Sequence, residues 1–75
     1  MLREYYNEHL LKLTAHSIVS STPIEELKDA WFSFNDDISL NVWTESNSVK
    51  AAIYDVVDGK IVTDDWKIIF EKQLN

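Results

Sequence analysis

The sequence predicts a single α+β domain in which two N-terminal helices pack on a three-stranded antiparallel meander. Three observations indicate this fold. Residues 2–34 carry apolar side chains at three- and four-residue spacing, residues 38–62 alternate between apolar and polar side chains, and Asp58-Gly59 interrupts the alternation. With 75 residues, one glycine and one proline, the chain has the size of one domain, residues 1–75, and little room for linkers.

The first helix is expected over residues 2–17. Glu8 and Lys12 lie on its solvated side and form an i,i+4 pair in the favourable orientation. The β-branched and serine run at residues 18–21 is expected to end the helix. The apolar stripe of this helix would consist of Leu2, Tyr6, Leu10 and Leu13.

A second helix is expected over residues 22–34. Thr22 can cap it, and Pro23 occupies the first helical position, where a missing N–H does no harm. Glu25 completes a capping box with Thr22. The buried stripe would consist of Ile24, Leu27, Trp31 and Phe34.

The meander is expected over residues 38–45, 48–57 and 60–63. Asp58-Gly59 predicts a type I′ turn between the last two strands, because both residues tolerate positive φ. Trp43 and Tyr54 fall on the face that looks away from the helices. The face that covers the helices would include Ile38, Leu40, Val42, Val49, Ala51, Ile53 and Ile61.

Residues 64–75 fit two structures. Trp66, Ile69, Phe70 and Leu74 share one helical face, which favours a short C-terminal helix. Trp66, Ile68 and Phe70 also alternate as in a strand, so the alternative is a fourth strand and a four-stranded meander.

Composition restricts the class of protein. The chain has no cysteine, which excludes disulfides and thiolate metal sites and fits a reducing, cytoplasmic setting. No apolar run reaches the length of a membrane span, and the polar N-terminal residues do not resemble a signal peptide. Ten of the thirteen acids lie between residues 21 and 65, and the net charge is −6. This distribution disfavours direct binding to nucleic acid or to an anionic membrane and favours a protein partner with a basic surface.

No motif in the sequence identifies a chemistry. There is no nucleophile elbow, glycine-rich phosphate loop or helical metal-protease motif. His9 and His16 lie about two helical turns apart, which is too far for one ion to bridge without other ligands. The expected protein is therefore not an enzyme, and no catalytic, cofactor-binding or metal-ligating residue is assigned.

The remaining signal is an aromatic sheet face with acidic residues around it, which in composition resembles a protein interface. The predicted function is that of a small acidic protein-binding module, most simply an inhibitor that occupies a functional surface of its partner. Compact, acidic, cysteine-free single domains of this kind resemble the inhibitors that phages and mobile elements make against host enzymes or defence systems. If the partner binds nucleic acid, the acids would stand in for its phosphates. The predicted partner-binding residues are Trp43, Tyr54, Glu45, Asp36, Asp37, Asp55, Asp58, Asp64 and Asp65.

Other functions remain open from the sequence. The chain could be an immunity or antitoxin-type protein, which also acts by covering a partner. It could form a homodimer with a structural role, or bind a small ligand between stacked aromatic rings.

Overall fold

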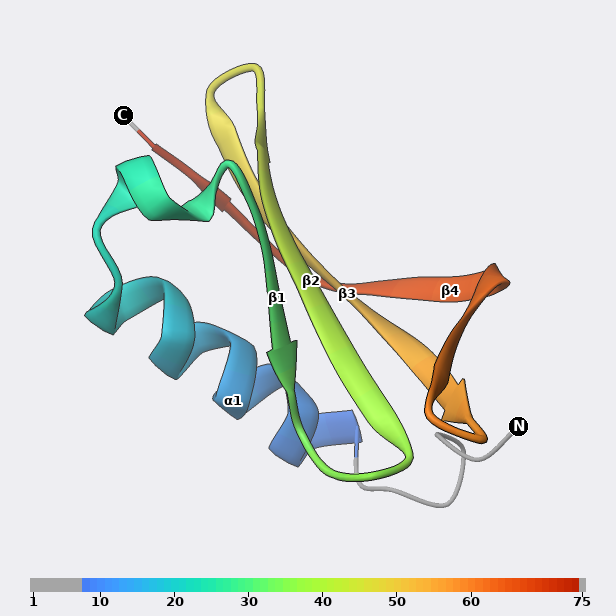
Figure 1. Ribbon diagram of the computed structural model, residues 1–75. Helices are drawn as coiled ribbons and strands as arrows, with labels where there is room; N and C mark the ends of the chain where they lie inside the picture. Colours follow the sequence, from blue (N-terminus) through green and yellow to red (C-terminus); the bar gives the residue numbers. More distant parts are fainter. Residues whose placement is uncertain (1–7, 75) are drawn as a thin grey trace.

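One helix, one short 3₁₀ turn and four strands make up the fold. The computed structural model describes residues 8–74 of the chain. Figure 1 shows α1 and the 3₁₀ turn η2 on the same side of a strongly twisted sheet. The elements in chain order are α1 (Glu8–Ser21), η2 (Ile24–Leu27), β1 (Asp29–Ser33), β2 (Ile38–Glu45), β3 (Ser48–Val57) and β4 (Lys60–Gln73).

The sheet is an antiparallel meander with the strand order β1-β2-β3-β4. Two-residue turns join β2 to β3 and β3 to β4. In the second turn Asp58 has φ 53° and Gly59 has φ 76°, so both residues have the positive φ that a type I′ turn requires. The predicted strands 38–45 and 48–57 and this turn are confirmed.

The last strand is bent where it leaves the hairpin. Tyr54 pairs with Trp66 and Val56 pairs with Ile61, so residues 62–65 of β4 lie opposite Asp55 alone. Extra residues on one strand of a pair bend that strand and strengthen its twist. Figure 1 shows the resulting sharp bend in β4.

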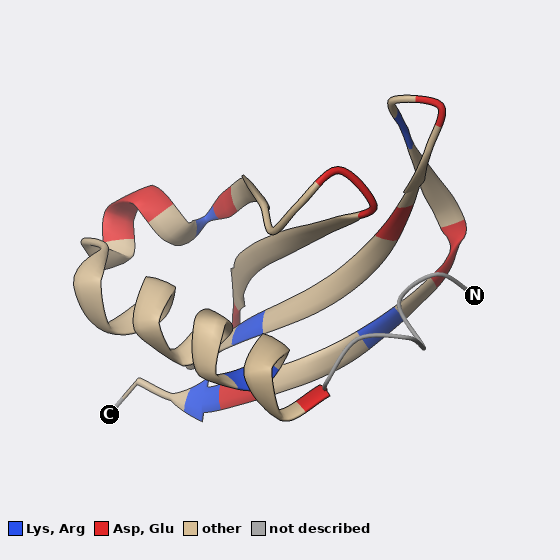
Figure 2. Cartoon of the chain, turned by 90° about the horizontal axis from the view of Figure 1, so that it is seen from below, with Lys and Arg blue, Asp and Glu red and all other residues tan. Residues whose placement is uncertain are grey.

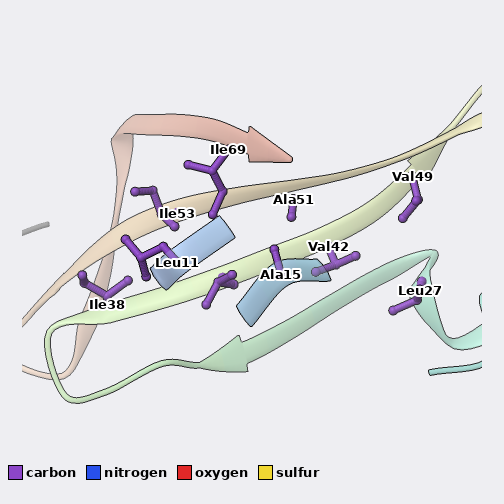
Figure 3. Close-up of a cluster of buried hydrophobic side chains, with 10 residues drawn as sticks. Leu11, Ala15, Leu27, Ile38, Val42, Val49, Ala51, Ile53 and Ile69 are labelled. Carbon is purple, nitrogen blue, oxygen red and sulfur yellow. The ribbon is translucent and has the colours of Figure 1, made fainter. Parts of the chain in front are cut away.

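The core lies between the helix and the inner face of the sheet (Figure 3). The core is apolar. It includes every buried inner-face side chain of β2 and β3 except Asp55. At roughly 25 cal/mol per Å² of buried apolar surface, such side chains are the main source of stability in a small domain. The core residues are Leu11, Ala15, Leu27, Ile38, Leu40, Val42, Val49, Ala51, Ile53 and Ile69. Ile61, which the alternation also assigns to the core, is 38% exposed.

The predicted fold is wrong in three places, and the first is the buried side of α1. Leu10 and Leu13 are 50% and 51% exposed, whereas Leu11 and Ala15 are buried. The helix also continues through residues 18–21 instead of ending at residue 17, and Ile18 and Val19 pack against the core. Leu11, Ala15 and Ile18 form a second apolar stripe with the same spacing as the predicted one, and the sheet selected it. The predicted stripe residues Leu2 and Tyr6 lie outside the described residues.

The second error is the predicted helix at residues 22–34. Only Ile24–Leu27 is helical, as a single 3₁₀ turn that begins after Pro23 without a side-chain cap, so the capping box does not form. Asp29–Ser33 is instead the edge strand β1, paired with β2 from Asp29↔Trp43 to Ser33↔Ser39. Aromatic residues favour strands. Pairing with β1 also gives hydrogen-bond partners to the backbone groups along the edge of β2, which would lack these partners if residues 29–33 were helical.

The third error is the C-terminal helix. Residues 60–73 form one continuous strand, β4, so the strand alternative for the C-terminal residues is the better description. The predicted alternative, a four-stranded meander, has the right number of strands, but the extra strand is β1. The C-terminal residues extend the predicted strand at residues 60–63 instead of forming a strand of their own. Over residues 8–74, no helix combines the length and apolar character needed to cross a membrane.

Candidate functional site

The sheet has one covered face and one open face. Contacts link α1 to β4, and η2 to β1 and β2, and both helical elements lie on the core side (Figure 1). Among residues 8–74, no helix or strand lies over the opposite face. Side chains that alternate with the core residues along each strand therefore point toward this open side.

Four aromatic rings, one from each strand, meet on the open face. Trp31 of β1 lies 4.9 Å from Tyr54 of β3, measured between ring centroids. Tyr54 lies 6.1 Å from Trp66 of β4, and Trp66 lies 6.4 Å from Trp43 of β2 in an edge-to-face arrangement. These spacings are typical of favourable aromatic pairs. We call Trp31, Trp43, Tyr54, Trp66 and the neighbouring Ile68 the aromatic face.

The aromatic face is only partly buried. Trp31 and Trp66 are each 46% exposed and Ile68 is 43% exposed, while Trp43 and Tyr54 are half-buried. Large apolar side chains from four strands thus form one continuous, accessible surface. Single exposed apolar residues are ordinary on protein surfaces, but a contiguous group of this kind marks an interaction site more often.

Two small side chains lie beneath the rings. Asn41 and Ala52 are cross-strand partners and point to the open side, yet Asn41 is 8% exposed and Ala52 is fully buried. Trp31 is the cross-strand neighbour of Asn41 and Ile68 is that of Ala52, so large side chains of the aromatic face flank both residues. Ala52 stands on β3 between Trp43 and Trp66, and its small side chain allows these two rings to meet across the strand.

Asn41 ties the edge strand to the rest of the sheet. Its Nδ2 donates to Oδ1 of Asp29 over 2.9 Å and to the carbonyl oxygen of Ala30 over 3.1 Å. Both acceptors belong to β1, the strand that carries Trp31. The buried amide nitrogen of Asn41 therefore has hydrogen-bond acceptors, and these hydrogen bonds fix the position of Trp31 relative to the other rings.

Glu45 is the acid that contacts the aromatic face most directly. Its Oε1 accepts a hydrogen bond from Trp43 Nε1 over 3.2 Å and lies 3.5 Å from Lys50 Nζ. The hydrogen bond from Trp43, followed by the charge and hydrogen bond of Lys50, lowers the pKa of Glu45 below its ordinary value. This carboxylate is exposed, so both interactions are screened by water.

The other predicted acids collect at one end of the molecule. β2 begins where β3 ends, with Ile38 opposite Asp55, and the bend of β4 lies beside the same position. Figure 2 shows red segments at this end in the β1–β2 loop, the β3–β4 hairpin and the bend of β4. Lys60 is the one lysine or arginine in these segments. We call Asp36, Asp37, Asp55, Asp58, Asp64 and Asp65 the acidic end.

One of these acids is not where the sequence suggested. Asp55 was expected on the exposed rim of the face, but it is 3% exposed and alternates with Tyr54, so it points to the inner side. Asp36, Asp58, Asp64 and Asp65 are exposed and Asp37 is half-buried. The acidic end borders the aromatic face at the cross-strand pair of Tyr54 and Trp66.

Three members of the aromatic face were not predicted from the sequence, namely Ile68 and the rings Trp31 and Trp66. Helical spacing assigns both Trp31 and Trp66 to the buried stripe of a helix that does not form. The signal that could have found them is the alternation of Trp31 with Ala30 and Phe32, and of Trp66 with Lys67 and Ile68.

Comparison with known proteins does not identify the chain. No family model matches it, and no curated protein and no solved structure is significantly similar to it. Within the described part of the chain, no three His, Asp or Glu side chains group closely enough to suggest a metal site.

Proposed function

We propose that this chain is a protein-binding module that occupies a surface of a partner protein with its aromatic face. One observation supports this most strongly. Trp31, Trp66 and Ile68 are each nearly half exposed, and Tyr54 connects the two tryptophans, on the side of the sheet that no described helix or strand covers. Tryptophan and tyrosine are enriched among the residues that dominate binding energy at interfaces.

The rings are also held in place before any partner arrives. Tyr54 contacts both Trp31 and Trp66, Asn41 anchors the strand of Trp31, and the indole of Trp43 donates to Glu45. A surface whose side chains are already ordered loses less conformational entropy on binding. This order favours an interface over an incidental group of exposed rings.

The edges of the sheet are poorer candidates for the contact. β1 has five residues, and β4 is bent and carries charged residues such as Asp64, Lys67 and Lys72 along its exposed length. Short, bent and charged edge strands are the usual means by which proteins avoid pairing with another chain. A partner is therefore expected on the open face and not as an added strand.

The acidic end supports an electrostatic role next to this contact. Carboxylates of one sign raise the association rate with a basic surface, while buried rings lower the dissociation rate. Such a module acts by covering a functional surface, as an inhibitor of an enzyme or defence protein does, with an immunity or antitoxin-type protein as the related alternative. A reducing, cytoplasmic setting fits a chain without cysteine.

Site-specific photo-crosslinking in cells that make the protein tests this function. A photo-reactive amino acid at Ile68 probes the aromatic face, and the same amino acid at Leu13 is the control, because Leu13 is similarly exposed but lies on α1. We expect one protein to be linked from position 68 and not from position 13. Excess unlabelled wild-type chain should compete, whereas a chain with Trp31→Ala and Trp66→Ala should not.

Two results would contradict the proposal. The first is a partner linked from position 13 and not from position 68. The second is equal competition by the wild-type chain and the double variant, once circular dichroism has shown that the variant is folded.

A further inference from the structure

Resting on the proposed function, we infer that the aromatic face receives a basic segment of its partner, with arginine guanidinium groups stacked on Trp31 and Trp66. The proposal thus commits to one occupant of the open face. Charge, ring packing and the positions of nearby carboxylates each support it.

The first support is charge. The register places Asp29, Trp43, Lys50 and Glu71 in one row across the open face. Lys50 is the one cation in this row, and Glu45 lies 3.5 Å from its Nζ. The acidic end borders the rings on the opposite side, at the cross-strand pair of Tyr54 and Trp66. The complementary partner surface is therefore positive.

The second support is the packing of the rings. Centroid spacings of 4.9 to 6.4 Å mean that neighbouring rings contact one another and leave no room for a cation between them. A cation must lie on the outer surfaces of Trp31 and Trp66, which are 46% exposed. A planar, weakly hydrated guanidinium stacks on such an open ring, whereas a compact, strongly hydrated ammonium keeps more of its water there.

The third support is the position of carboxylates beside the exposed rings. Asp29 lies two residues before Trp31 on the same side of β1, about 7 Å along the strand. Asn41 Nδ2 holds Asp29 Oδ1 at 2.9 Å, so this carboxylate is already oriented. Asp64 lies two residues before Trp66 and is exposed. An arginine on Trp31 can thus pair with Asp29 in the two-pronged geometry that lysine cannot reproduce.

A second copy of the chain is a worse occupant of the same face. Each copy carries a net charge of −6 and the same acidic end, so a face-to-face dimer would bring like charges together. Nucleic acid is disfavoured for the same reason, although stacked rings can bind bases.

The test uses three peptides of one length in which glycine alternates with arginine, lysine or citrulline. Citrulline keeps the planar shape of arginine without its charge, and lysine keeps the charge without the plane. Each peptide is titrated into the ¹⁵N-labelled chain, and the indole N–H signals of the three tryptophans are followed by NMR. We expect saturable shifts at Trp31 and Trp66 with the arginine peptide, several-fold weaker binding of the lysine peptide, and no binding of the citrulline peptide.

Variants of the chain locate the binding. Trp66→Leu is expected to weaken the arginine peptide about two- to fivefold, the effect of one exposed cation–π contact. Asp29→Asn should also weaken it. Glu25→Gln is the matched control, because Glu25 is an exposed acid on η2 at the core side of the sheet, and it should change binding less than Asp29→Asn does.

Equal affinity for the arginine and lysine peptides would overturn the inference, as would shifts confined to the acidic end. Both results come from the wild-type chain and do not depend on a variant that folds. If the peptides fail while a partner is still crosslinked from position 68, the inference is wrong and the proposed function stands. A concentration-dependent dimer in sedimentation that Trp66→Leu abolishes would overturn both.

Discussion

Asn41 shows how a single polar residue supports the aromatic face. It is 8% exposed, and its Nδ2 donates to Asp29 and to the carbonyl oxygen of Ala30. The sequence places Asn41 on the outer side of its strand, where an exposed polar residue is expected. The rings above it change its role from a solvated side chain to a buried link between β1 and β2.

Replacing Asn41 should therefore destabilise the fold and loosen β1. We expect Asn41→Ala to lower the free energy of unfolding by about 1–3 kcal/mol, since one lost hydrogen bond goes to a charged acceptor. Chemical denaturation measures this value. Ser39→Ala on the same face of β2 is the control, and an equal effect of the two substitutions would contradict a special role for Asn41.

Glu45 provides a second prediction at this scale. The hydrogen bond from Trp43 is the largest cause of its lowered pKa, and Lys50 adds to it. Because the folded pKa lies below the unfolded one, the stabilising contribution is present above the unfolded pKa and is lost as pH falls through the folded pKa. Trp43→Phe should raise the pKa of Glu45 toward its ordinary value, which a carboxyl NMR titration measures. An unchanged pKa in this variant would contradict the assigned cause.

Helix α1 illustrates an ambiguity at the scale of an element. Two apolar stripes with helical spacing exist on it, one with Leu10 and Leu13 and one with Leu11 and Ala15. The periodicity shows that a helix forms but does not distinguish the stripes. The inner face of the sheet buries Leu11 completely and leaves Leu13 half exposed.

The two leucines should therefore differ strongly when shortened. Leu11→Ala is expected to destabilise the chain by about 2–5 kcal/mol, because it leaves a cavity in the core. Leu13→Ala should change stability by no more than about 0.5 kcal/mol. Thermal or chemical denaturation of the pair measures the difference, and similar losses would mean that α1 packs with its other side inward.

The turn between β3 and β4 is the element in which sequence and structure agree most closely. Gly59 has φ 76°, and a Cβ at this position would have no neighbouring atom within 4 Å, so the constraint there is backbone conformation and not crowding. We expect Gly59→Ala to cost about 1–2 kcal/mol, the penalty of a left-handed conformation. Gly59→Asn is the control, because asparagine tolerates this conformation better, and it should restore part of the loss. Chemical denaturation of the two variants measures the difference, and equal losses would contradict a conformational cause.

At the scale of the whole molecule, aromatic rings and acids occupy adjoining regions with different expected effects on binding. Neutralising Asp36 and Asp58 at the acidic end should mainly slow association with the partner, and added salt should do the same. Trp66→Leu should mainly speed dissociation. Surface plasmon resonance with the crosslinked partner separates the two rates, and equal effects of both kinds of variant on dissociation would contradict this division.

The central hairpins were predictable from local chemistry. Alternation over residues 38–45 and 48–57 and the Asp58-Gly59 turn each depend on residues close in sequence, and these elements are confirmed. The outward direction of Trp43 and Tyr54 followed from the same period of two. Two of the four rings of the aromatic face could therefore be assigned in advance.

The rest was decided by contacts between distant residues. Residues 22–34 and 64–75 carry patterns that fit a helix or a strand, and the free edges of β2 and β3 selected the strand because each offers backbone hydrogen bonds along its length. That choice moved Trp31 and Trp66 from expected helix interiors to the open face. Local pattern determined where the chain turns and alternates, and only tertiary pairing brought the four rings together, because each ring comes from a different strand.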